Sequence, residues 1–172
     1  MAPFRAGTNA TTGPIPGESL VLTATLGSSC VERRGATDIT WGETLVAPSQ
    51  AVVAQSARVD SATNLTLIEA SFVRIRVTNG GWTGIGDTRS YPPSAADLAR
   101  ADNPDWSHRL PVAGAQLEPG TLYMLVFGLH LAGADIPATL RGASVTFEAG
   151  GQRSSRAVVT NLRLPAEGVR CT

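Results

Sequence analysis

His108 and His130 are the side chains of this sequence best suited to transfer protons near neutral pH. Ser107 stands beside His108 as a nucleophile stands beside its base, but neighbouring residues of a strand point to opposite faces. The two are therefore not expected to act together. His130 interrupts an apolar run and is interpreted as a hydrogen-bonded histidine of the core or its rim. Because no G-x-S-x-G motif is present either, the sequence predicts a protein that is not an enzyme.

Acidic side chains offer oxygen ligands in one short region, which contains Asp97, Asp102, Asn103 and Asp105. Their spacing lacks the glycine and the final glutamate of an EF-hand loop, so they are interpreted as capping and solvated residues. The glycine-rich run 80–86 is not followed directly by a helix and lacks a third glycine at the spacing of a dinucleotide-binding loop. We therefore expect no metal site and no cofactor.

The two cysteines, Cys30 and Cys171, either form one disulfide or remain buried thiols. A bridge is the preferred interpretation, because Cys171 lies at a chain end that would otherwise fray. It would close a loop of about 140 residues, for which the chain-entropy model gives roughly 5 kcal/mol of stabilisation as an upper figure. Disulfides persist in oxidising compartments. The sequence therefore predicts an extracytoplasmic protein, secreted or associated with the cell envelope.

Composition excludes several classes of function. Hydrophobic residues make up 42% of the 172 residues, which is enough for a core, and the net charge is zero. All fourteen basic residues are arginines, and they are scattered along the chain. No basic stripe is present for a phosphate backbone, so nucleic-acid binding is not predicted. The longest apolar run has about half the length that a membrane-spanning helix needs, so no transmembrane segment is predicted.

The stretch from Leu122 to Leu131 is apolar almost throughout. Such a run without polar alternation is typical of a strand that is buried on both faces, and we expect it at the centre of the core. Phe72 to Val77 alternates instead. Its valines and isoleucine are expected to face the core, and Phe72 with its two neighbouring arginines is expected to face solvent.

Other segments predict a strand-rich domain. Strands are expected at 20–26, 39–46, 51–59, 65–77, 109–113, 122–131, 143–149 and 153–164. A tight turn is expected at 60–64, and Gly150-Gly151 predicts a hairpin. Residues 1–19, rich in proline and glycine, are interpreted as an extended N-terminal arm on a domain at 20–172. The fold class is all-β: an antiparallel immunoglobulin-like β-sandwich of about seven to nine strands with one short helix.

The long connection at 79–109 contains that helix, predicted at 95–101 with Ser94 as N-cap and Asp97 as its capping partner. Irregular connections of this length tend to be functional or to cover other elements. Aromatic and polar side chains gather in it, and they form the candidate binding set: Trp82, Asp87, Arg89, Tyr91, Asn103, Trp106 and His108. Such sets bind sugars or proteins by stacking and hydrogen bonding. The alternative is that the aromatic rings plug the open end of the sandwich.

Three stretches carry a resemblance to a known group: residues 122–129, 145–151 and 162–164. Their pattern resembles uncharacterised exported immunoglobulin-like β-sandwich proteins of GC-rich bacteria, over roughly the second half of the chain. The resemblance implies an extracytoplasmic location and no known activity. The Cys, Trp and Cys spacing of true immunoglobulin domains is absent, because Cys171 lies close to the end of the sequence.

The sequence thus favours a non-catalytic extracytoplasmic module that binds or scaffolds a protein or glycan partner through the 79–109 connection. A second hypothesis is a structural or accessory subunit of an envelope or virion assembly, which uses the arm at 1–19 and pairs edge strands between copies. A third is a hydrolase that uses His108 with nearby carboxylates. The oligomeric state is left open.

Overall fold

The computed structural model describes residues 18–24, 27–78, 81–82, 84–101 and 104–171. The first sheet contains β1 (Leu20–Ala24), β3 (Asp38–Pro48), β10 (Tyr123–Leu131), β5 (Leu65–Arg74) and β8 (Leu110–Pro111), in that spatial order. The second contains β2 (Ser28–Cys30), β12 (Gln152–Leu164), β11 (Ala138–Ala149), β4 (Val52–Thr63) and β9 (Gln116–Leu117). β6 (Val77–Thr78), β7 (Gly81–Trp82), the helix α1 (Ala95–Arg100) and a 3-10 turn (Pro104–His108) lie in or beside the connection.

The strand order is that of an immunoglobulin-like sandwich. In chain order β1, β3, β4, β5, β10, β11 and β12 take the places A to G, which gives sheets A-B-E-D and C-F-G. The pairs within the two large sheets are antiparallel except for β2, which runs parallel to β12. The predicted fold class is confirmed.

The central strand β10 is buried on both faces, as its apolar sequence predicts. Tyr123, Leu125, Phe127 and Leu129 point into the core between the sheets, where Phe127 stacks on Trp41 of β3 at 5.7 Å between ring centroids. Strands of this kind alternate their side chains between two faces. The outer face of β10 therefore also needs an apolar cover.

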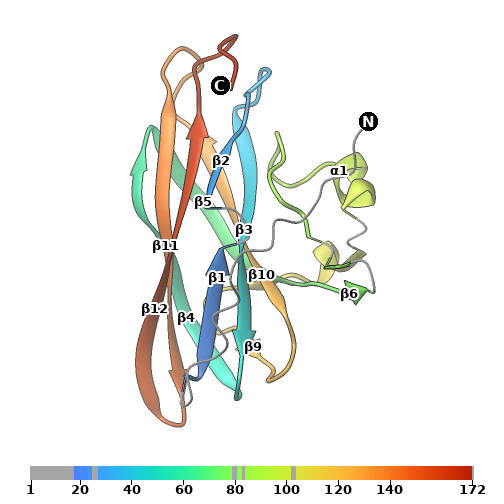
Figure 1. Ribbon diagram of the computed structural model, residues 1–172, viewed down its shortest axis with the longest axis vertical. Coiled ribbons are helices and arrows are strands. Elements are labelled where there is room, and N and C mark those ends of the chain that lie inside the picture. The colour runs from blue at the N-terminus through green and yellow to red at the C-terminus, as the bar shows by residue number, and fades with distance from the viewer. Residues whose placement is uncertain (1–17, 25–26, 79–80, 83, 102–103, 172) are drawn as a thin grey trace.

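The connection supplies that cover. Met124 and Val126, on the outer face of β10, form a second cluster with Val73, Ile85 and Trp106. The connection lies on the side of the first sheet that faces away from the second sheet (Figure 1). The sequence-based expectation that the connection covers something is thus met by an apolar sheet face.

This second cluster corrects the prediction for residues 72–77. Phe72 lies in the core between the sheets, whereas Val73 and Ile75 face the connection. Val77, expected in the core, is 71% exposed. Arg74 and Arg76 are exposed as predicted. The prediction for Phe72 was wrong because it assumed one buried face and one solvated face, whereas both faces are covered at Phe72 and Val73.

The predicted hairpin turn and the predicted helix cap are both present in the structure. Gly150 and Gly151 both have positive φ, 55° and 77°, and join β11 to β12 as the predicted hairpin. The Ser94 hydroxyl accepts a hydrogen bond from the Asp97 amide at 3.1 Å, which caps α1 as predicted. The predicted turn at 60–64 is shorter than expected. Residues 60–63 extend β4, and only Asn64 turns, with φ 57°.

The predicted arm at 1–19 falls mainly on residues 1–17, which lie outside the described part of the chain. Of the arm, Ser19 is held by the turn after β3, where the Ser49 amide donates to its carbonyl at 3.1 Å. Among the described residues, no helix is long and apolar enough to cross a membrane.

Gly128 provides a test of how tightly the connection is seated on β10. A Cβ added there would lie 2.6 Å from ring atoms of Tyr91 in the connection. Overpacking of this kind costs about 1–3 kcal/mol, so Gly128→Ala is expected to lower the free energy of unfolding by that amount in urea titrations. Gly133→Ala is the matched control, because its new Cβ would meet nothing closer than 3.6 Å. Equal stability of the two variants would show that Tyr91 does not rest on Gly128.

Candidate functional site

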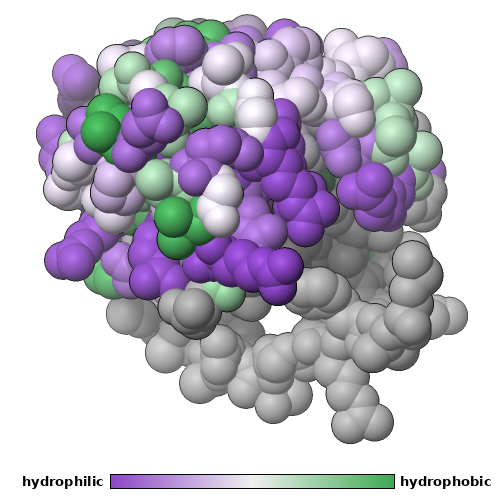
Figure 2. Space-filling model, turned by 90° about the horizontal axis from the view of Figure 1, so that it is seen from above, coloured by the Kyte–Doolittle hydropathy of each residue, from purple (hydrophilic) through white to green (hydrophobic). Residues whose placement is uncertain are grey.

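A cavity of about 560 Å³ lies between the connection, the segment that follows β2, and Cys171. Six charged side chains line it: Glu32, Arg34, Asp87, Arg89, Asp97 and Arg100. It lies near the C-terminal end of the sandwich, and the surface seen from above that end is largely hydrophilic (Figure 2). Pockets with convergent polar groups are the usual place for ligands, which makes this cavity the candidate site.

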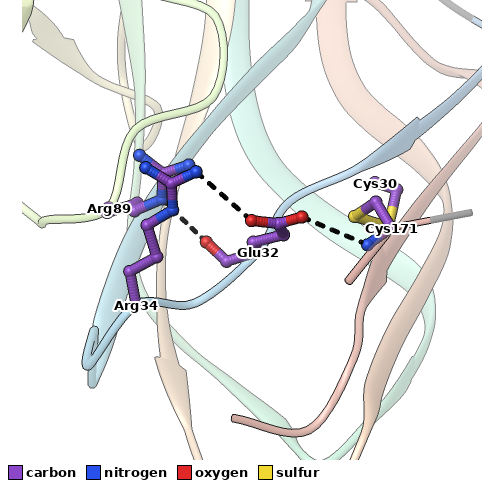
Figure 3. A network of polar contacts seen from close by, with 5 residues as sticks. All are labelled: Cys30, Glu32, Arg34, Arg89 and Cys171. Atoms are coloured by element: carbon purple, nitrogen blue, oxygen red, sulfur yellow. Dashed lines mark hydrogen bonds and ion pairs between the residues drawn. A yellow bond between two sulfur atoms is a disulfide. The ribbon is translucent and has the colours of Figure 1, made fainter. Parts of the chain in front are cut away.

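The disulfide forms one wall of the cavity. The structure joins Cys30 to Cys171, with 5.9 Å between the Cα atoms, as predicted from the sequence. The Cys171 amide donates to Oε1 of Glu32 at 3.4 Å. The bridge therefore holds the end of the chain against the segment that follows β2 (Figure 3).

Glu32 accepts hydrogen bonds from several residues of this wall. Its Oε2 accepts from Arg34 at 3.3 Å, and its main-chain carbonyl accepts from Nε of Arg89 at 2.7 Å (Figure 3). The Cys171 amide, and then Arg34, hold the pKa of the Glu32 carboxyl below its usual value. Glu32 is therefore ionised at neutral pH and links the connection to the disulfide.

The neighbouring Arg33 anchors this segment to the residues that follow β10. It is only 2% exposed, and its guanidinium donates to the carbonyls of Gly133 and Ile136. Arg34 follows in a turn, with a φ of 50°, and both Glu32 and Arg34 line the cavity.

Asp87, on the connection, also lines the cavity. The residue is half-buried, and its Oδ1 is buried with no hydrogen-bond partner in the described part of the chain. Burial, and then the negative charge of Glu43, raise the pKa of Asp87 to about 7. The Gly42 amide and the nearby Ser29 hydroxyl, which lacks hydrogen-bond geometry, offset this only in part. Asp87 thus changes charge near neutral pH.

The free edge of β3 positions the part of the connection that carries Asp87 and Arg89. Thr88 forms a two-way backbone bridge with Thr40, at 3.2 and 3.0 Å. The Thr40 hydroxyl also donates to the Ser90 carbonyl at 2.6 Å. Within the described residues, β1 pairs with β3 from Thr44 to Pro48, and the connection bonds to the same edge of β3 farther along, at Thr40.

The predicted binding set is divided by the structure. Asp87 and Arg89 line the cavity, whereas Tyr91 and Trp106 pack edge to face, 6.1 Å apart, in the layer that covers the first sheet. Trp106 is 8% exposed and lies under the Arg109 guanidinium. The Tyr91 hydroxyl donates to Glu69 at 2.5 Å, and burial raises its pKa. These two aromatic rings cover the outer face of the first sheet, and not the open end of the sandwich that the alternative interpretation gave them.

The remaining members of the set do not reach the cavity or are not described. Asn103 and the side chain of Trp82 lie outside the described part of the chain. His108 is exposed, and its Nδ1 is 3.3 Å from the Ser107 hydroxyl. The expectation that this pair points apart was wrong, because the two residues lie in a 3-10 turn and not in a strand. His130 is exposed at the rim and contacts Asp38 at 2.7 Å.

Sequence reasoning missed Glu32, Arg34 and Arg100 as site residues. The first two lie in a segment for which no strand, helix or site was predicted. Their position two to four residues after a disulfide cysteine indicated proximity to Cys171, but no signal in the sequence brought them to Asp87 and Arg89. Among the described residues, no group of three or more side chains is placed to hold a metal ion.

Comparisons with known proteins add little to this geometry. No protein-family model and no curated protein matches the sequence. Among solved structures, the ASH / PapD-like domain of human CEP192 (PapD-like domain 7) is similar at 8% identity and a TM-score of 0.37, over 96% of this chain and 99% of that chain. A likeness this low supports no inference, so the site is interpreted from its own residues.

Proposed function

We propose that this protein is a non-catalytic extracytoplasmic module that binds or scaffolds a protein or glycan partner through the cavity beside the disulfide. The observation that carries the proposal is the cavity itself, in which charged side chains from two distant parts of the chain converge beside Cys171. Its walls are held by the Cys30–Cys171 bridge and by the Thr40–Thr88 bridge. A preformed site of this kind loses little entropy when a partner binds.

The extracytoplasmic part of the proposal is supported by the disulfide, since such bonds are rare in reducing compartments. The resemblance to exported proteins of GC-rich bacteria agrees with it and stays a prediction. The contact surface is narrower than the whole 79–109 connection. Because Trp106 and Tyr91 cover the first sheet, the proposed surface consists of Asp87, Arg89 and their polar neighbours.

An assembly subunit is the second candidate, and the edge of β5 favours it. The pairing of β5 with β8 covers Ser71 and Phe72. Farther along β5, Leu67 and Ile68 are 45% and 48% exposed. Among the described residues, no strand pairs with this edge at Leu67 and Ile68. An apolar edge of this kind is a surface on which another chain can pair.

Capture from an envelope extract of the source cells distinguishes the two candidates. The immobilised full chain is compared with Arg89→Gln, with Ile68→Lys and with the control Arg153→Gln, whose exposed arginine lies at the far end of β12. We expect the amount of the captured partner to fall about tenfold or more with Arg89→Gln only, because a charge-assisted contact is removed.

Deletion of residues 79–109 is not a suitable variant, because it would uncover the apolar outer face of β10. Loss of capture with Ile68→Lys alone would support assembly through the β5 edge and contradict binding by the cavity. Equal capture by all four proteins would contradict both candidates.

A further inference from the structure

The cavity contains one arginine that differs from the others in its partners. Arg34 forms an ion pair with Glu32 at 3.3 Å, and Arg100 forms one with Asp97 at 3.0 Å. Arg89 has no ion pair with any carboxylate in the described part of the chain, and its one hydrogen bond there runs from Nε to a carbonyl. Since a guanidinium carries five N–H donors, the outer fork of Arg89 remains available to a ligand.

Arg34 and Arg89 both contact Glu32, and their guanidinium groups are drawn on the same side of it (Figure 3). The Glu32 carboxylate is paired with Arg34 only and also accepts from the Cys171 amide, whereas Arg89 bonds the Glu32 carbonyl. This leaves an excess of positive charge at one wall of the cavity. A planar carboxylate is the anion that best matches an arginine fork, because it accepts two parallel hydrogen bonds.

The connection, which carries Arg89, also has two unpartnered polar atoms in residues that line the cavity. Oγ of Ser90 and Oδ1 of Asp87 are buried and have no hydrogen-bond partner in the described part of the chain. A hydroxyl or a protonated carboxyl group can donate to a carboxylate oxygen. The charged groups near Asp87 are Glu43 on β3 and the cavity residues already named, so protonation of Asp87 removes one of the negative charges that would repel an anion.

Two features favour a peptide over a sugar as the source of the carboxylate. No aromatic side chain is among the described residues that line the cavity, whereas sugars are commonly bound by stacking on aromatic rings. In addition, β2 is an edge strand of the second sheet, and its last residue, Cys30, lines the cavity. An extended peptide can pair with such an edge through its main chain.

We propose that the cavity binds the carboxylate of an acidic side chain in an extended protein segment, with Arg89 as its main contact and Arg34 as the second. This inference rests on the proposed function and names the ligand chemistry of the same site. It also gives the binding a pH dependence. Affinity is expected to rise severalfold from about pH 8 to about pH 6, since Asp87 is then protonated while the glutamates of the ligand stay ionised.

Calorimetric titration with two capped peptides, tetraglutamate and tetraglutamine, tests the proposal on the full oxidised chain. We expect tetraglutamate to bind and tetraglutamine not to bind. Arg89→Gln is expected to weaken the binding of tetraglutamate about tenfold or more, and Arg89→Lys to restore only part of it, because lysine lacks the fork. The control Arg153→Gln keeps the net charge equal to that of Arg89→Gln and should bind like the wild type. Near-UV circular dichroism checks that each variant is folded.

Three results would overturn the inference: equal binding of the two peptides, an equal loss with Arg89→Gln and Arg153→Gln, or no binding of tetraglutamate at millimolar concentration. Binding of oligogalacturonate in place of tetraglutamate, with the same dependence on Arg89, would also overturn it and assign the site to acidic glycans. In all these cases, capture of a native partner that still depends on Arg89 would leave the proposed function intact. If tetraglutamate binds in a manner that depends on Arg89 but no native partner is captured, the proposed function is contradicted and the inference stands.

Discussion

Replacement of both cysteines, as Cys30→Ser with Cys171→Ser, is expected to lower the free energy of unfolding by about 3–5 kcal/mol. The bridge spans a sequence separation of 141 residues, and the entropy that a cross-link removes from the unfolded chain grows with the length of the closed loop. Few single bonds in a domain of this size can have a comparable effect, since total stabilities are about 5–15 kcal/mol.

The same change is expected to open one wall of the cavity. Without the bridge, the Cys171 amide is no longer held at Glu32, which then loses the contact that contributes most to its low pKa. Binding of an acidic ligand should weaken in parallel with stability. Urea titrations of the oxidised wild type, the reduced wild type and the double variant measure the effect, and the last two should agree.

A loss of less than about 1 kcal/mol would contradict this prediction, because the effect of a typical native disulfide is larger. It would mean that other contacts hold the end of the chain in place. The candidates are the hydrogen bonds of Glu167, whose amide donates to Ala134 and whose carboxylate accepts from Gly35, both at 2.9 Å.

The second large effect is expected at Asp87, whose pKa in the folded protein is about 7 against an ordinary value of 3.8. Between these values the folded state binds a proton that the unfolded state does not, so stability falls as pH rises from about 4 to about 7 and stays low above that. A shift of this size corresponds to at most about 4 kcal/mol. Asp87→Asn, which carries no charge, is therefore expected to be more stable than the wild type at about pH 8 by roughly 2–4 kcal/mol.

Urea titrations at several pH values between about 5 and 8 provide the measurement. The difference in the free energy of unfolding between wild type and Asp87→Asn isolates the contribution of Asp87. Glu32 and Glu69 have lowered pKa values, so they make stability rise with pH, but they do so equally in both proteins. Asp135 is exposed, and Asp135→Asn serves as the control. If the curves of wild type and Asp87→Asn run parallel, Asp87 is not desolvated and the carboxylate keeps an ordinary pKa.

The elements that could be predicted from the sequence are those whose signals are local. The glycine pair of the hairpin and the Ser94–Asp97 cap act over two to four residues, so neighbouring residues were enough to identify them. The apolar run of β10 indicated burial on both faces for a similar reason. The disulfide needed only the observation that the chain has two cysteines and that one lies close to its end.

The candidate site could be predicted only in part. Asp87 and Arg89 were included because polar residues beside aromatic ones are typical of binding sites. The aromatic rings themselves belong to the layer that covers β10. Ser107 and His108 were assigned to opposite faces because a strand was assumed, and the 3-10 turn brings them together. In both cases the prediction used only neighbouring residues, and the tertiary structure placed the side chains differently.

The amino-acid sequence by itself determined the β-sandwich, its central strand, its hairpin, its capped helix and its single cross-link, because periodicity and turn chemistry act between near neighbours. Only the tertiary structure decided that residues 32, 87 and 171 share one cavity and that Asp87 is desolvated there beside Glu43. It also decided that the 79–109 connection covers the outer face of the first sheet. The burial of a side chain, the electric field at a carboxyl group and the contacts of both depend on residues far apart in the chain. A local sequence pattern does not indicate which distant residues come into contact.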